Sequence, residues 1–180
     1  MKKEIENNKG FTIVETLVAI TILMIAIAGP LTVAFRGLTA AVYAHDQVTA
    51  SYLAQDAMEY IKNVRDNNLK TPGRSWLDGI NTTSLVCTNL SDNCTVNTLN
   101  NPYDTGGGTC GPDCYLYLKS DGSGYTPESG GNKQTQFTRK YYITSTSNPD
   151  EVTATVIVEW KNGTVSNAVT LSSQLFNIRK

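Results

Sequence analysis

The sequence lacks most of the residues from which common catalytic and metal sites are built. It contains a single histidine, His45, so no nucleophile–histidine pair or histidine metal site is in view, and we expect His45 to lie at the surface. No glycine-rich phosphate loop follows a predicted strand. The net charge of −1 provides no basic surface for nucleic acid. These absences argue against an enzyme, and we expect no catalytic residue, metal site or cofactor.

Charge is also missing from residues 16–35. At about 1.5 Å per residue, a helix of this length spans roughly 30 Å, the thickness of a bilayer core. Arg36 ends the run, and Lys2, Lys3 and Lys9 precede it, which favours an N-terminus held in the cytoplasm. The pattern predicts a protein that crosses the cytoplasmic (inner) membrane once and carries its remaining residues outside the cytoplasm.

A carboxylate, Glu15, stands at the very start of this apolar run. A carboxylate at the centre of a bilayer costs about 2.5–3.5 kcal/mol on insertion scales, and ionisable groups within membranes usually have a partner. Glu15 lies near the cytoplasmic end, where the cost is smaller. One interpretation is that Glu15 only reaches the lipid headgroups, and the other is that it pairs with a cation.

The sequence KGFTIVETL, residues 9–17, resembles the processing site of type IV prepilins and pseudopilins. The resemblance implies that a membrane prepilin peptidase cuts between Gly10 and Phe11 and methylates the new amine of Phe11. It also implies that Glu15, the fifth mature residue, meets the Phe11 amine of a neighbouring subunit and guides assembly. Such an amine has a reference pKa near 8, and a buried ion pair is better at specifying register than at adding stability.

Two other interpretations of the front end remain. The apolar run can be a permanent anchor, or a secretory signal cut after the small-residue pattern Ala26-Ile27-Ala28. Gly29 and Pro30 interrupt the run, because proline lacks the backbone donor of a regular helix. They predict a plain kink or, as the resemblance implies, a segment that loosens in an assembled filament.

Residues 37–68 predict an amphipathic continuation of the helix that stops at Asn67-Asn68, before Pro72-Gly73. Its apolar positions follow helical spacing. They are Ala50, Ala54, Ala57, Met58, Ile61 and Val64. The segment SYLAQDAMEYIKNVRDNN, residues 51–68, also resembles the minor pilin and type II pseudopilin branch of the family.

The four cysteines lie behind the apolar run, in the turn-rich residues 69–136. They are Cys87, Cys94, Cys110 and Cys114. An even number in an exported region favours disulfides, and four cysteines allow three pairings. The simplest pairing joins neighbours and closes two short loops. A four-thiolate metal site is the rival, but the spacing is a poor match to common zinc patterns.

The C-terminal part alternates apolar and polar residues, which predicts strands. CYLYLK and YTP form one hairpin, and QFTRKYYITST, VTATVIVEW and residues 165–175 form a meander with Asn162-Gly163 at its last turn. The expected fold is α+β: a long N-terminal helix packed on an antiparallel sheet, the pilin fold. The predicted divisions are 1–10 (leader), 11–36 (transmembrane or filament-core helix), 37–68 (amphipathic helix), 69–136 (disulfide-containing loops with a hairpin) and 137–180 (meander).

The sequence therefore predicts a non-enzymatic filament subunit, a minor pilin or pseudopilin. Its expected partners are prepilin peptidase, other pilin subunits, membrane lipid before assembly and an assembly platform in the inner membrane; nucleic acid is expected only in a DNA-uptake pilus. The sequence does not distinguish a pilus from type II secretion or DNA uptake. The alternative is a membrane-anchored adhesin or ligand-binding domain, for which Trp76, Tyr103 and Tyr125 are loop residues that can form a binding surface.

Overall fold

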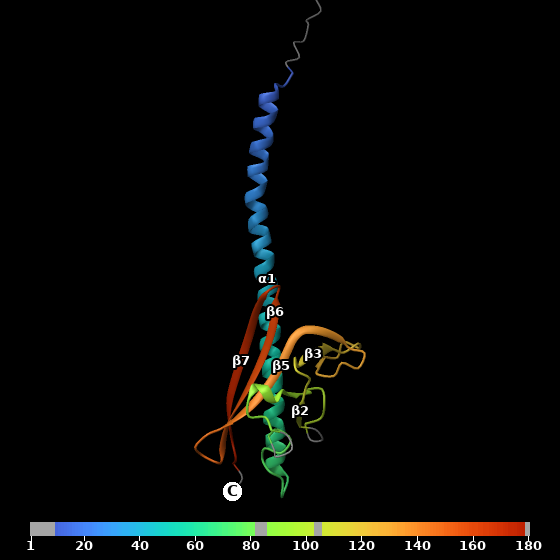
Figure 1. Cartoon of the computed structure of the whole chain (residues 1–180), viewed down its shortest axis with the longest axis vertical. Coiled ribbons are helices and arrows are strands. Elements are labelled where there is room, and N and C mark those ends of the chain that lie inside the picture. Colours follow the sequence, from blue (N-terminus) through green and yellow to red (C-terminus); the bar gives the residue numbers. More distant parts are fainter. Residues whose placement is uncertain (1–9, 82–85, 103–105, 179–180) are drawn as a thin grey trace, which may run out of the picture. The chain divides into compact units, whose positions relative to one another are not determined.

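A computed structural model describes residues 10–81, 86–102 and 106–178 (Figure 1). The chain divides into two units, residues 1–44 and 45–180. Helix α1, Ile13–Lys70, begins in the first unit and ends in the second. We describe the units separately and refer to residues 45–180 as the head.

The described part of the first unit consists of residues 10–12 and the N-terminal part of α1, and it buries nothing. Every residue from Gly10 to His45 is exposed, including large apolar side chains all around the helix. By length and composition this segment can cross a membrane. Because an apolar helix with no polar face is stable only in lipid or among other helices, this segment requires such surroundings.

The helical assignment continues without a break through Gly29 and Pro30. Pro30 cannot donate a backbone hydrogen bond. Two residues later, the hydroxyl of Thr32 donates to the carbonyl of Ala28 at 2.9 Å. The kink at Gly29-Pro30 stays a prediction.

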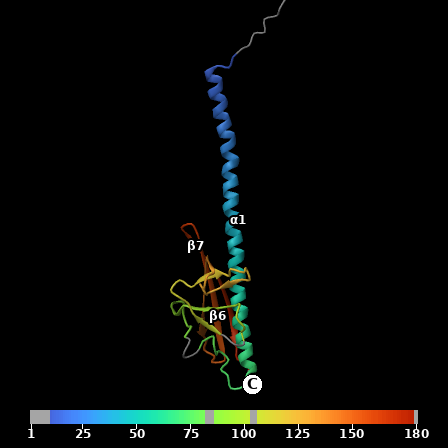
Figure 2. The ribbon, with the colours of Figure 1, turned by 90° about the vertical axis from the view of Figure 1, so that its right-hand side faces the viewer.

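In the head, α1 covers one face of an antiparallel sheet (Figure 2). The strand order is β4-β3-β5-β6-β7. The strands are β3 Tyr115–Leu118, β4 Tyr125–Thr126, β5 Lys133–Ser145, β6 Glu151–Asn162 and β7 Val165–Phe176. The expected hairpin and meander thus join into one sheet, and the prediction of a helix packed on an antiparallel sheet is confirmed.

The core lies between this sheet and the inward face of α1. All six predicted apolar positions of the helix are buried, from Ala50 to Val64. They pack against alternate residues of the strands, including Ile143, Val156 and Val158. Alternate side chains of a strand point to opposite faces, and these residues lie on the buried face of the strands that the alternation predicted.

The β6–β7 turn differs by one residue from the expected one. Asn162 is the last residue of β6 and pairs with Val165, so Gly163 and Thr164 are the two turn residues. Gly163 has a φ of +63°. A positive φ at the first central position is the requirement of a type II′ turn, which glycine meets most easily.

The loop region contains more regular structure than expected. A short ribbon pairs β1, Cys94–Val96, with β2, Gly107–Thr109, and a 3₁₀ turn, η1, covers Leu90–Asp92. The disulfides join Cys87 to Cys94 and Cys110 to Cys114. The ribbon therefore carries a disulfide at its first residue and a second one immediately after it.

Helix α1 ends at Lys70, slightly later than the Asn67-Asn68 stop that the sequence indicated. Asn68 is buried within the helix, and its side-chain amide donates to the carbonyls of Trp76 at 3.3 Å and Asp78 at 2.7 Å. The amide thus fixes the loop after the helix and does not terminate the helix itself. An asparagine is a weak helix former, which is why the sequence pattern misplaced the end.

Candidate functional site

The predicted processing site lies where α1 begins. Gly10 and Phe11 precede the helix, and Thr12 caps it: the Thr12 hydroxyl accepts the Glu15 N–H at 3.3 Å, and the Thr12 carbonyl accepts the Thr16 N–H at 3.1 Å. Thr12 and Glu15 have the spacing of a capping box. A cut between Gly10 and Phe11 would thus leave one residue, Phe11, before the cap.

The Glu15 side chain is exposed in the first turn of α1, and it has no hydrogen-bond partner among the described residues. The second half of the capping box, from the Thr12 N–H to the Glu15 carboxylate, is not formed. A carboxylate in the first helical turn gains about 0.3–1 kcal/mol from the helix dipole. That gain is smaller than the cost of an unpaired carboxylate deep in a bilayer, so the helix start alone does not explain a glutamate beside an apolar run.

Gly10 has no structural need to be a glycine. A Cβ added to Gly10 would meet no atom within 4 Å, and its φ is not in the left-handed region. Gly106, by contrast, lies directly against the backbone of Gly79 and has no room for a side chain. The described residues therefore give no reason for a glycine at position 10.

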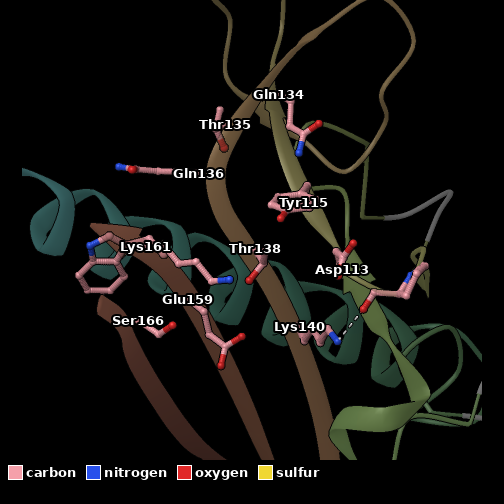
Figure 3. A pocket seen from close by; sticks show the side chains of 12 residues that line it. Asp113, Tyr115, Gln134, Thr135, Gln136, Thr138, Lys140, Glu159, Lys161 and Ser166 are labelled. Atoms are coloured by element: carbon pink, nitrogen blue, oxygen red, sulfur yellow. Dashed lines mark hydrogen bonds between the residues drawn. The ribbon is translucent and has the colours of Figure 1, made fainter. Parts of the chain in front are cut away.

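The head carries a shallow groove on the face of the sheet turned away from α1 (Figure 3). Its volume is about 480 Å³, and Tyr115, Thr138, Lys140 and Glu159 are among its lining residues. The Lys140 ammonium already donates to the Asn93 side chain at 2.7 Å and to the Pro112 carbonyl at 3.2 Å. The groove thus presents polar and charged groups of both signs, part of which bind within the head.

The remaining candidate residues of the sequence are placed as follows. The side chain of His45 is 80% exposed, and no cluster of three metal-ligating side chains occurs in the described ranges. All four cysteines form disulfides, so they are not thiolate ligands. Trp76 and Tyr125 pack against the core, while Tyr103 lies outside the described residues. Two of the three aromatic loop residues proposed for a binding surface are therefore used in packing.

Sequence reasoning included Arg139 in a predicted strand but missed its role. Its guanidinium is buried and donates to the carbonyls of Leu53 at 3.2 Å and Val96 at 2.8 Å, with the Asp56 carboxylate at 3.6 Å. Burial lowers the pKa of Arg139 to about 10, although Asp56 opposes the shift. This one side chain links α1, β1 and β5. The signal in the sequence was a lone arginine at an inward position of an alternating strand.

Comparison with known proteins identifies the front of the chain. A family model described as the Prokaryotic N-terminal methylation motif matches residues 6–29, a segment that includes Gly10, Phe11 and Glu15. No curated protein and no solved structure matches the chain. The motif and the exposed apolar helix together indicate a membrane-anchored protein. The front of the chain thus resembles proteins that carry this methylation motif, and it is joined to a head in which a helix packs on an antiparallel sheet in a pilin-like architecture.

Proposed function

We propose that this chain is a minor pilin or pseudopilin: a non-enzymatic subunit of a type IV pilus-like filament. Prepilin peptidase cuts it between Gly10 and Phe11, and Phe11 is then methylated. The observation that carries the proposal is the motif match over residues 6–29, which lies on a helix whose entire N-terminal surface is apolar and exposed. The irregular disulfide region supports a minor subunit over a major one.

The exposed apolar segment has two successive environments in this proposal. Before assembly it lies in the inner membrane, with the leader in the cytoplasm and the head outside. After assembly it packs among the same segments of neighbouring subunits. Both environments remove the apolar side chains from water. In the isolated chain these side chains are exposed.

Glu15 acquires its partner only after cleavage. In the uncut chain Phe11 has a peptide N–H, and the Glu15 carboxylate has no partner among the described residues. The cut produces an amine with a reference pKa near 8, which is positively charged at neutral pH. In a filament the Glu15 carboxylate pairs with the Phe11 amine of an adjacent subunit. A shift by one helical turn would leave both charges unpaired in apolar surroundings, so the pair fixes the register of the subunits.

The substitution Glu15→Gln separates this role from helix capping, because it removes the charge but keeps the Glu15 N–H that donates to the Thr12 hydroxyl. We expect the variant to lose its leader normally but to be absent from filaments sheared from the cells. Glu59→Gln is the matched control, since Glu59 is an exposed carboxylate on α1 in the head; it should be incorporated like the native chain. Normal incorporation of the Glu15→Gln chain would overturn the assembly role of Glu15.

A second candidate function, a membrane-anchored ligand-binding domain, is favoured only by the groove beside Tyr115. Its volume of about 480 Å³ is within the usual range for ligand sites. However, such sites are lined mostly by apolar side chains, whereas most residues that line this groove are polar or charged, and its Lys140 is engaged. Binding of the full chain to a glycan, to DNA or to a surface, without filament incorporation, would favour this second function.

A further inference from the structure

The groove beside Tyr115 lies on the face of the sheet turned away from α1, and the strand register arranges its side chains in rows (Figure 3). Tyr115 of β3 pairs with Thr138 of β5, and Thr138 pairs with Glu159 of β6. Residues that pair in register place their side chains on the same face, with their Cβ atoms about 5 Å apart. These three side chains therefore form one row across three strands.

A second row runs beside the first. Gln136 lies two residues before Thr138 on β5, and Lys161 lies two residues after Glu159 on β6. Lys161 in turn pairs with Ser166 of β7. The groove thus crosses four strands, from β3 to β7. At about 4.8 Å between neighbouring strands, it is roughly 14 Å long.

Tyr115 supplies the groove with an aromatic ring. The pairing of β3 with β5 shifts register between Tyr115 and Tyr117, and a bulge of this kind re-aims the side chains next to it. Tyr115 is only half-buried, and its ring borders the groove (Figure 3). A tyrosine ring has apolar faces and a polar hydroxyl tip, so this side chain offers both kinds of contact to a ligand.

Several polar side chains of the groove are not used within the protein. In the described ranges no hydrogen bond or ion pair is formed by the side chains of Tyr115, Gln136, Thr138, Glu159 or Lys161. Amide and hydroxyl groups both donate and accept, a carboxylate accepts, and an ammonium group donates. The two rows therefore present free hydrogen-bonding groups of both kinds, close to the aromatic ring.

The charges that line the groove cancel. Asp113 and Glu159 are acidic, whereas Lys140 and Lys161 are basic, so the formal charge of the lining residues is zero. Binding of a phosphate backbone requires an excess of positive charge, and a cation site in proteins is built mainly from carboxylates and carbonyls. A balanced lining is instead complementary to a ligand that is polar but carries no net charge.

We propose that this groove binds a neutral oligosaccharide. A pyranose ring has a face of C–H groups that packs on an aromatic ring, and its rim consists of hydroxyls that each donate and accept. Tyr115 supplies the aromatic ring, and Thr138 and Glu159 supply polar groups in the same row. A sugar unit is about as long as the spacing between strands, so the groove has room for a disaccharide or a trisaccharide.

Sugar binding by the head is independent of the assembly proposed above. The groove and α1 lie on opposite faces of the sheet, so a bound sugar does not displace the helix from the head. Access to an external glycan rests on the proposed function, in which the head lies outside the cytoplasm. A failure of assembly would appear in sheared filaments, and a failure of sugar binding would appear in a titration of the purified chain, so the two outcomes are distinguishable.

The first test is isothermal titration calorimetry of the full chain, solubilised in a detergent without a sugar headgroup. The probes are three neutral trisaccharides: maltotriose, cellotriose and triacetylchitotriose. We expect at least one of them to bind, with an affinity that Tyr115→Ala lowers about tenfold or more and Tyr115→Phe largely keeps. Tyr52→Ala is the matched control, since Tyr52 is an exposed tyrosine on α1 of the head, and it should bind like the native chain. Absence of binding by all three sugars, or native affinity in Tyr115→Ala, would overturn the proposal.

The second test examines the polar row with a change that preserves side-chain shape. Thr138→Val removes the hydroxyl next to Tyr115 and should weaken binding of the same trisaccharide. Thr153→Val is its control, because Thr153 also lies on β6 facing away from α1 but outside the groove, and it should change nothing. Equal affinities of the two variants would contradict the assignment of the row.

The third test examines the charge of the ligand. A neutral sugar should bind equally well at low and high salt, because no counterions are released. Trigalacturonic acid, an acidic trisaccharide, should bind more weakly than the best neutral probe. Stronger binding of the acidic sugar, or of a short single-stranded DNA, together with a marked loss of affinity in high salt, would show an anion site and refute the proposal.

Discussion

The buried Arg139 gives a stability prediction whose size follows from the structure. Arg139→Met keeps a long side chain in the same space but removes the charge, whereas Arg139→Ala removes both. We expect Arg139→Met to lower the free energy of unfolding of the head by about 0–3 kcal/mol. Arg139→Ala should lower it by about 2–5 kcal/mol more, because a cavity then remains in the core.

The small expected effect of Arg139→Met on the free energy of unfolding is the balance of two contributions. Burial lowers the pKa of Arg139 from 12.5 to about 10, so folding disfavours the charged form by about 3 kcal/mol. The hydrogen bonds to the carbonyls of Leu53 and Val96 offset this cost, because bonds from a charged donor are roughly twice as strong as bonds between neutral groups. Removal of the guanidinium therefore removes a cost and a gain of similar size. Asp56 adds little, because its side chain is 54% exposed.

Urea unfolding of the detergent-solubilised chain measures these differences, with tryptophan fluorescence as the signal. Both tryptophans, Trp76 and Trp160, pack in the head, so the signal reports the head and not the apolar helix. Asp56→Asn is the control and should change the free energy of unfolding by no more than about 1 kcal/mol. Equal losses for Arg139→Met and Arg139→Ala would refute the balance, because the charge and its bonds would then outweigh packing.

Two further predictions concern the disulfide region. Gly107→Ala should destabilise the head by about 1–3 kcal/mol, because its Cβ would collide with the buried Tyr141 hydroxyl, which donates to the Ile80 carbonyl. Gly108→Ala is the control: its added Cβ meets open space, so it should leave the stability of the head unchanged. Urea unfolding of both variants measures the difference. Backbone N–H groups of Thr88 and then Asn89 lower the pKa of Asp92 below its usual 3.8, so its carboxylate stabilises the fold above that pH and loses this effect as the pH falls through the lowered pKa. The stability difference between the native chain and Asp92→Asn should therefore shrink below about pH 3.8, and a difference independent of pH would contradict the assignment.

The fold was predictable where one period dominates the sequence. Helical spacing from Ala50 to Val64 identified the buried face of α1, and alternation of apolar and polar residues identified the strands β5 and β6 that meet it. Both patterns come from backbone geometry, so they survive without knowledge of the partner element. The end of α1 was less predictable. Asn68 is of a residue type that favours a helix end, but here it lies within the helix, and its buried side-chain amide fixes the following loop.

The loop region was unpredictable because its order comes from contacts between distant residues. The three glycines of residues 106–108 have different surroundings. Gly106 contacts Gly79 and Gly107 contacts Tyr141, whereas a Cβ at Gly108 would meet no atom within 4 Å. The β1–β2 ribbon similarly depends on tertiary packing, since three-residue strands have no stability of their own. No pattern within 69–113 encodes these contacts.

The processing motif was readable from the sequence for a different reason. The motif is a short continuous segment that contains Gly10, Phe11 and Glu15, so its information is local, and the family model matches the same segment. In our proposal this segment is what the peptidase recognises. The partner of Glu15 was harder to predict from the sequence. It is an amine that does not exist until the chain is cut, and it belongs to another subunit in our proposal.

Mass spectrometry of the N-terminal peptide, from protein isolated in its native membrane, tests the central claim most directly. The account predicts a mature chain that begins with N-methylated Phe11. A chain that begins at Gly29 would show a secreted protein released by a signal peptidase, and an intact Met1 would show an unprocessed anchor. Either of these two results would contradict the account.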